Sequence, residues 1–239
     1  MNIVISQPMF FPWVGMFEQI RLGDVYVHYS DVPFSKGSFV NRVQVKTAHG
    51  IVWMTVPLSK QQLGQPICEV RINYQKDWRH KHRELLRQAY ARTPYQDDIL
   101  QIVDSVCSEP HATLDELSKA SIAAVCGYLG LEESRRFLDI RELDVGGGSS
   151  QRVLDTVLAL DGDTYTTGLG ARNYLDHELF EAANVRVNYM DYRKTPYPQL
   201  HGEFSPYVSI LDLIANTGGE SGDYIHSESI YWKEFLQNE

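Results

Sequence analysis

The sequence predicts an α/β fold of three layers, with a Rossmann-like sheet that is parallel or mixed and with a helical insertion. Short β-branched runs alternate with segments of helical periodicity. The stretches richest in glycine, aromatic and polar residues stand where such a run gives way to a helix, as at the ligand-binding turns of α/β sheets. With 239 residues, we expect a single domain over 1–239 that includes a mostly helical block at about 77–130.

The opening unit has a strand at 2–6, a helix at about 14–22 and a second strand at 25–29. In a parallel sheet, the loop after the first strand lies at the carboxyl edge, where ligands bind and a helix N-terminus offers free N–H groups. The glycine patterns of dinucleotide-binding and Walker loops are absent. An equally weighted alternative is that Trp13 and its neighbouring phenylalanines cover the sheet edge. The candidate binding residues of this loop are Gln7, Trp13 and Gly15.

Several segments together resemble the WbqC-like protein family, whose members are often associated with bacterial cell-surface polysaccharide genes. The resemblance covers nearly the whole chain. The matching segments are QP-x-F-x-PW-x-G at 7–15, then D-V-Y-V, S-D-V-P-F-S-K-G and N-R-V-Q-V-K within 24–46, W-x-x-x-H at 78–82, Y-T-T-G-L-G-A-R-N-Y-L at 165–175 and Y-P-Q-L-H-G-E-F-S-P-Y-V-S-I-L-D-L at 197–213.

The resemblance implies a transferase of O-antigen-type polysaccharide biosynthesis that moves an acyl or aminoacyl group onto a nucleotide-linked amino sugar. An amide-forming ligase is a related hypothesis. The first turn is also similar to nucleotidylyltransferase-type domains, whose relatives include ligases that use an acyl-adenylate. ATP and acyl-CoA are the two co-substrates compatible with this chemistry, and the sequence leaves the choice open. The alternative is a non-catalytic sugar-nucleotide-binding protein that assists glycan enzymes.

Composition narrows the class of protein. The formal charge of −9 argues against nucleic acid as a partner, because such binding depends on clustered cations. No apolar run reaches the roughly 18 residues of a membrane helix, so we expect no membrane insertion. No secretory signal is present, which predicts a cytoplasmic protein. The three cysteines follow neither a disulfide nor a zinc pattern, so we expect core thiols and no metal site. The oligomeric state stays open.

A basic loop follows the second strand. Lys36 and Arg42 suit a phosphate or carboxylate, and Asn41 adds an amide; the alternative is a solvated loop. A hairpin around His49 and Gly50 is expected next, with a buried strand at 51–57 that Pro57 ends and a further strand at 67–72.

Residues 78–90 change to helical spacing, with His82 on the same face as Trp78. A histidine titrates near neutral pH, so His82 is a candidate general acid or base. The alternative is a half-buried helix histidine held by a neighbour. Two more helices are expected at about 95–107 and 113–129, the latter with a capping box of Thr113 and Glu116 and a left-handed cap at Gly130.

After an extended segment at 137–143, glycines 146–148 precede a helix at 151–160. Successive backbone N–H groups there would form an anion site, but glycine runs are also simply flexible, so a phosphate role is left open. A strand at 163–167 leads to a second glycine-bearing turn and a helix at 174–182. Gly168 allows close backbone approach, Arg172 would hold an anion unless it pairs with Asp176, and Tyr174 opens the helix.

The last part of the chain has a strand at 185–189, a turn that contains Gln199, a helix at 207–216 and a short helix with Tyr231 and Trp232. Gln199 is a candidate for substrate binding. Asp212 lies within the predicted helix 207–216, where it would act as a catalytic carboxylate or would anchor a backbone N–H.

Overall fold

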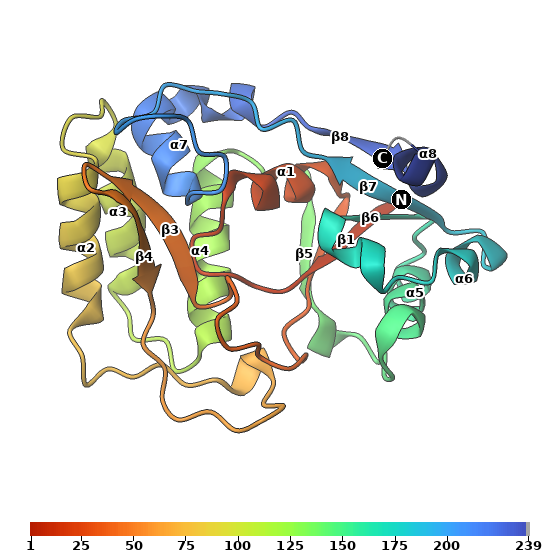
Figure 1. Cartoon of the computed structure of the whole chain (residues 1–239). Helices are drawn as coiled ribbons and strands as arrows, with labels where there is room; N and C mark the ends of the chain where they lie inside the picture. The colour runs from red at the N-terminus through yellow and green to blue at the C-terminus, as the bar shows by residue number, and fades with distance from the viewer. Residues whose placement is uncertain (238–239) are drawn as a thin grey trace.

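The computed structural model describes residues 1–237 and contains a six-stranded sheet of order β5-β2-β1-β6-β7-β8 (Figure 1). Every neighbouring pair is parallel except β7 and β8. The predicted Rossmann-like α/β fold is confirmed. The strands and helices are β1 Asn2–Ser6, α1 Val14–Leu22, β2 Val25–His28, β3 Arg42–Thr47, β4 Gly50–Thr55, α2 Trp78–Ala89, α3 Gln96–Cys107, α4 Leu114–Tyr128, β5 Arg136–Asp139, α5 Ser149–Ala159, β6 Thr164–Thr167, α6 His177–Ala182, β7 Arg186–Asp191, α7 Ile210–Thr217, β8 Glu228–Tyr231 and α8 Trp232–Gln237.

The central strands bury both faces because alternate side chains enter different cores. Ile3 and Ile5 of β1 pack with the side chains of α5 and α6, whereas Val4 of the same strand packs with those of α1 and α4. The sheet is therefore the middle of three layers.

A second unit packs beside the sheet. It contains the antiparallel hairpin β3–β4 and the helices α2, α3 and α4, which Figure 1 shows on the side away from α5 and α6. Helix α7 packs against α3. Helix α4 begins with the predicted capping box of Thr113 and Glu116, and Gly130 ends it with a φ of +66°. Among the described residues, no helix has both the length and the apolar character needed to cross a bilayer.

A strand is present near the predicted range 51–57, but the prediction that it is buried is wrong. Strand β4 ends at Thr55, and only Met54 in it is buried. Because the hairpin has two strands and packs on the core by one face, Val52 and Met54 point inward while Ile51 and Trp53 are 46% and 41% exposed. The apolar run looks like a buried strand because its outward positions also carry apolar residues.

Two further predictions need correction. Residues 67–72 form no strand: a 3₁₀ turn at Ile67–Glu69 follows Pro66, and the backbone N–H groups of Ile67 and Cys68 donate to loop carbonyls. The extended segment predicted at 137–143 ends early, because Asp139 caps a 3₁₀ turn over Ile140–Glu142. The edge strand β8 was not predicted at all.

Candidate functional site

A cleft opens where the strand order reverses. Strand β1 has β2 on one side and β6 on the other, so the connections after β1 and β6 diverge and leave a crevice at their carboxyl ends. This cleft has a volume of about 730 Å³, within the range of small-molecule sites. Its polar lining consists of Ser6, Gln7, Gln19, Tyr29, Asp31, Ser149, Arg152, Tyr165, Thr167 and Tyr174, together with backbone at Gly147, Gly148, Gly168 and Gly170.

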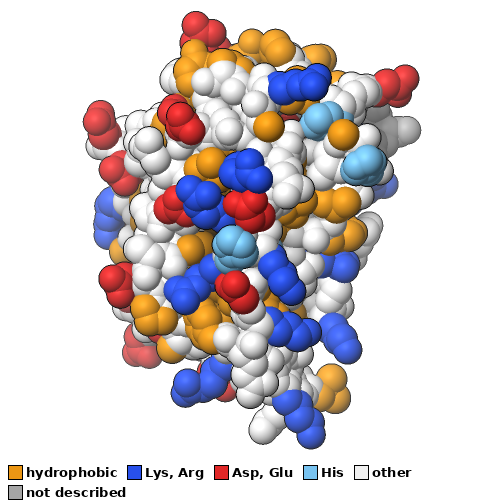
Figure 2. Space-filling view, turned by 90° about the vertical axis from the view of Figure 1, so that its left-hand side faces the viewer, with side chains coloured by type: hydrophobic (Ala, Val, Ile, Leu, Met, Phe, Trp, Pro, Cys, Tyr) orange, Lys and Arg blue, Asp and Glu red, His pale blue; other side chains and the backbone are white. Residues whose placement is uncertain are grey.

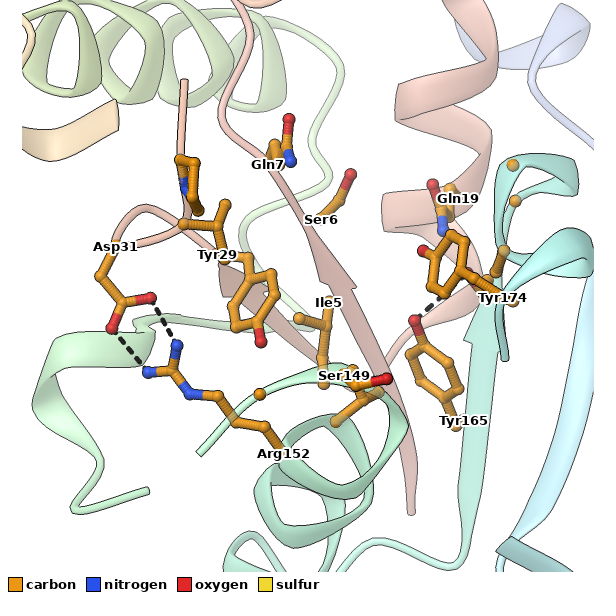
Figure 3. A pocket seen from close by; sticks show the side chains of 18 of the residues that line it. Ile5, Ser6, Gln7, Gln19, Tyr29, Asp31, Ser149, Arg152, Tyr165 and Tyr174 are labelled. Carbon is orange, nitrogen blue, oxygen red and sulfur yellow. Dashed lines mark hydrogen bonds and ion pairs between the residues drawn. The ribbon is translucent and has the colours of Figure 1, made fainter. Parts of the chain in front are cut away.

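One side of the cleft carries uncharged hydrogen-bonding groups. Gln19 of α1 is only 8% exposed, yet its amide has no partner among the described residues. Gln19 lines the cleft together with Tyr174, Ser6 and Gln7, which Figure 3 labels. A β-carbon placed on Gly168 would lie 3.9 Å from Gln19 Oε1, so the glycine keeps space free next to this amide. The amide atoms are not among the buried polar atoms that lack a partner, so they are open to the cleft and available to a ligand.

The opposite side carries one ion pair. Arg152 of α5 donates to both carboxylate oxygens of Asp31, at 2.9 and 2.6 Å, and its Nε donates to the Val145 carbonyl. The guanidinium also lies 5.2 Å from the centre of the Tyr29 ring. Hydrogen bonding to Asp31 raises the pKa of Arg152. The charges of this pair offset each other, so the described lining has no net charge from Asp, Glu, Lys or Arg.

The glycine loop reaches the cleft at the N-terminus of α5. Gly148 is the N-cap residue, and no side chain caps the first turn. Ser149 then has a φ of +55°, a left-handed conformation that is strained for a residue with a side chain. Ser149 and not the predicted glutamine begins the helix. The free N–H groups of this turn suit an anion.

The cleft tyrosines stay protonated at neutral pH. Burial raises the pKa of Tyr29, Tyr165 and Tyr174. The Tyr165 hydroxyl donates to Thr167 Oγ1 at 3.2 Å. These neutral hydroxyls add hydrogen-bonding groups and aromatic surface to the cleft, which suits a sugar or a nucleoside.

Three of the predicted binding residues, Gln7, Gly168 and Tyr174, line this cleft. Trp13 and Gly15 do not. The Trp13 ring lies 4.8 Å from the ring of Tyr192, and a β-carbon on Gly15 would lie 2.2 Å from the Trp13 ring. The spacing of tryptophan and glycine in this motif therefore serves packing at the sheet edge.

Lys36, Asn41 and Arg42 lie together in a second hollow of about 330 Å³ beside the end of β4. Arg42 lies over the Trp53 ring at 4.2 Å and donates to the Gly37 carbonyl, and Asn41 donates to the Val56 carbonyl. The predicted cationic loop is thus one cluster, outside the switch-point cleft.

His82 is buried in α2. Its Nε2 lies 3.1 Å from the Thr55 carbonyl, to which it donates, and its Nδ1 has no partner. Burial lowers the pKa of His82 to about 4, so the ring is neutral at pH 7. Its placement matches the helix histidine held by a neighbour and gives no support to proton transfer in the cleft.

Asp212 and Gln199 belong to a buried network under the hairpin. The Tyr197 hydroxyl donates to Asp212 at 2.9 Å, Gln199 donates to that hydroxyl, and Lys46 of β3 donates to Gln199 at 2.7 Å. Burial raises the pKa of Asp212 and lowers that of Lys46. These hydrogen bonds link α7 to β3. None of the four residues lines the cleft.

Arg172 is an exposed residue of the 3₁₀ turn Leu169–Asn173 and does not line the cleft, although Gly170 and Ala171 of the same turn do. Sequence reasoning missed most of the residues that do line the cleft. Tyr29 and Thr167 stand at or beside strand carboxyl ends, so the edge rule would have found them. Gln19 and Arg152 carry no such signal, because each lies inside a helix whose orientation only the fold determines.

The fold defines a Rossmann-like α/β protein, with a polar cleft of no net charge at the switch point of its sheet. The model of the WbqC-like protein family matches residues 7–224, and the chain belongs to that family. A relative from Mycobacterium tuberculosis (strain H37Rv), described as the uncharacterized protein Rv1507c, is 32% identical over 227 residues, which cover 94% of this chain and 97% of the relative. No solved structure matches the chain significantly.

Proposed function

We propose that the switch-point cleft binds a nucleotide-linked amino sugar in cell-surface polysaccharide biosynthesis. The observation that carries the proposal is the unpartnered amide of Gln19, which lines the same cleft as an uncapped helix N-terminus. The first suits a sugar or base edge, and the second suits a phosphate group. The family resemblance supplies the biological setting.

Binding without catalysis is the form of this function that the described lining supports most directly. Of the two predicted catalytic residues, His82 and Asp212, neither lines the cleft, and the one carboxylate in its lining, Asp31, is held by Arg152. The protein would then hold the sugar nucleotide for another glycan enzyme.

Acyl or aminoacyl transfer is the second candidate, favoured by the strain at Ser149. Strained residues collect at sites of chemistry, and Ser149 faces the same cleft. Its hydroxyl has no base within hydrogen-bond distance among the described residues, so it would orient a substrate. The acceptor for the amine proton would come from the second substrate or from Asp31 released by Arg152.

A thermal-shift screen tests binding, with ATP, acyl-CoA, and UDP- and dTDP-linked sugars as ligands. A ligand at about a hundred times its dissociation constant stabilises the folded chain by about 2.7 kcal/mol. Gly168→Leu should abolish the shift, because its side chain would fill space that is open apart from Gln19. Gly219→Leu, at an exposed glycine whose added side chain meets nothing, is the matched control.

The outcome separates the two candidates. A shift with a sugar nucleotide alone supports binding, whereas an additional shift with ATP or acyl-CoA directs the next assay to pyrophosphate or CoA release. A shift that Gly168→Leu leaves intact would place the ligand elsewhere, and no shift with any ligand of the panel would contradict the proposal.

A further inference from the structure

Charge is segregated along the chain. Residues 32–83 contain nine Lys or Arg and two Asp or Glu, whereas the remaining residues contain thirteen and twenty-nine. The first group has a net charge of +7 and the rest −16, within a chain of net charge −9. Residues 32–83 form the hairpin, its flanking loops and the first half of α2. A chain that is acidic overall therefore has one basic region.

The basic side chains form a continuous surface. The hollow with Lys36 and Arg42 shares Thr55 and Pro57 with a neighbouring hollow of about 480 Å³, which is lined by Lys76 and Lys81. We name the surface of these two hollows and their rim the cationic face. Figure 2 shows Lys and Arg side chains gathered beside hydrophobic side chains on the lower half of this side of the molecule.

The lysines of the cationic face form no ion pairs with acidic side chains of the described residues. Among the described residues, Lys36, Lys60, Lys76 and Lys81 have no acidic partner, whereas Arg83 and Arg87 further along α2 pair with Asp104 and Glu84. Each hollow thus holds two cations that the fold does not neutralise.

Trp53 lines the larger of the two hollows, and other large apolar side chains of residues 32–83 are also exposed. Phe39 is 46% exposed, and its ring lies 5.4 Å from that of Trp53, which is 41% exposed. Leu63, in the loop after Lys60, is fully exposed, and Ile51 lies two positions from Trp53 on the same side of β4. Single exposed apolar residues need no explanation, but a group of them among unpaired lysines does.

We propose that the cationic face docks the protein on an anionic lipid bilayer. Lysines attract anionic headgroups, and exposed tryptophan, phenylalanine and leucine enter the interface between headgroup and acyl chain. The two hollows give places for headgroup phosphates, and the acidic remainder of the chain faces the water. A single-stranded nucleic acid would also use cations and aromatic rings, but the aliphatic side chains of Leu63 and Ile51 favour lipid.

Vesicle sedimentation with the full chain tests this proposal. We expect binding to phosphatidylcholine vesicles that contain phosphatidylglycerol, no binding to phosphatidylcholine alone, and release at about 1 M salt, where the Debye length falls to about 3 Å. Replacing Lys76 and Lys81 by glutamine should weaken binding about fivefold for each lysine, or about 25-fold together.

One double variant controls for overall charge, and two single variants test the exposed apolar side chains. Arg186→Gln with Lys233→Gln removes two exposed cations at the other end of the sheet and should bind like the unmodified protein. Leu63→Ser changes a side chain that is fully exposed, so the fold is unaffected, and it should weaken vesicle binding severalfold. A blue shift of tryptophan emission on vesicles should disappear in Trp53→Phe.

Three results would overturn the proposal. They are absence of binding to anionic vesicles, an equal loss of binding in the lysine pair and in the control pair, and tighter binding of a labelled single-stranded oligonucleotide than of vesicles at the same salt with the same dependence on Lys76 and Lys81. The last result would assign the cationic face to nucleic acid.

Discussion

The switch-point cleft and the cationic face differ in how they treat charge. The cleft balances its one cation against Asp31 and keeps a neutral amide unpartnered, whereas the cationic face keeps several lysines unpaired and exposed. A buried ligand site must limit its charge because desolvation is costly, but a surface for an extended anion need not. Under the two proposals, the contrast teaches that the cationic face would attract an extended anion, whereas the cleft would hold its ligand through uncharged polar groups.

The hairpin that carries the cationic face is linked to α7 by the buried network of Asp212, Tyr197, Gln199 and Lys46. Disrupting this network should have the largest effect on stability. Asp212→Leu leaves the Tyr197 hydroxyl and the Lys46 ammonium without their carboxylate, which we expect to lower the free energy of unfolding by about 3 to 5 kcal/mol. Asp212→Asn keeps an acceptor for Tyr197 and should cost less than half as much. Urea denaturation measures both. If Asp212→Asn folds normally, retains ligand binding and loses transfer activity, Asp212 has a catalytic role and not a structural one.

The pH dependence of stability gives a smaller effect. Burial lowers the pKa of His82 to about 4, from an ordinary value of about 6.5. The unfolded chain therefore takes up a proton as pH falls below about 6.5, while the folded chain does so only near 4. The contribution of His82 to the free energy of unfolding is fully present above pH 6.5. It decreases by about 3 kcal/mol as the pH falls from 6.5 to 4.

His82→Gln provides the measurement, because glutamine retains a donor for the Thr55 carbonyl and does not titrate. Its free energy of unfolding should fall less steeply from pH 7 to 4.5 than that of the unmodified protein, and the difference between the two curves isolates His82. His28, whose pKa burial also lowers to about 4, remains in both proteins and cancels. Parallel curves would show that His82 is not a buried neutral ring.

The sequence sufficed for most of the fold, because hydrophobic period and cap chemistry are local properties. The short apolar run Ile3-Val4-Ile5 predicts the first strand, and Gly130 predicts the end of its helix. The errors at 51–57 and 67–72 arose where tertiary contacts decide: a hairpin that is covered on one face, and N–H groups that donate to loops instead of to a neighbouring strand.

The site was less predictable for the same reason. Gln7, Gly168 and Tyr174 were identified because they follow strand ends, and this rule depends on chain order alone. Gln19 and Arg152 reach the cleft only because α1 and α5 lie on opposite faces of the sheet. Lys36 and Arg42 follow β2 in sequence, but the chain carries them to the hairpin, away from the strand end.

The smallest expected effect in free energy concerns Gln19. It also distinguishes the cleft from the cationic face best. Gln19→Leu should weaken the binding of the sugar nucleotide by about 1 to 3 kcal/mol, because a polar group of the ligand would lose its hydrogen-bond partner on burial. The same change should leave the free energy of unfolding nearly unchanged, because the amide is open to the cleft and makes no hydrogen bond to the described residues. Lys81→Gln should leave affinity for the sugar nucleotide unchanged, because that lysine belongs to the cationic face. Calorimetric titration and urea denaturation of the two variants measure both quantities. A Gln19→Leu protein that is destabilised yet binds normally would make the amide part of the scaffold, and the cleft would lose the group that best defines it.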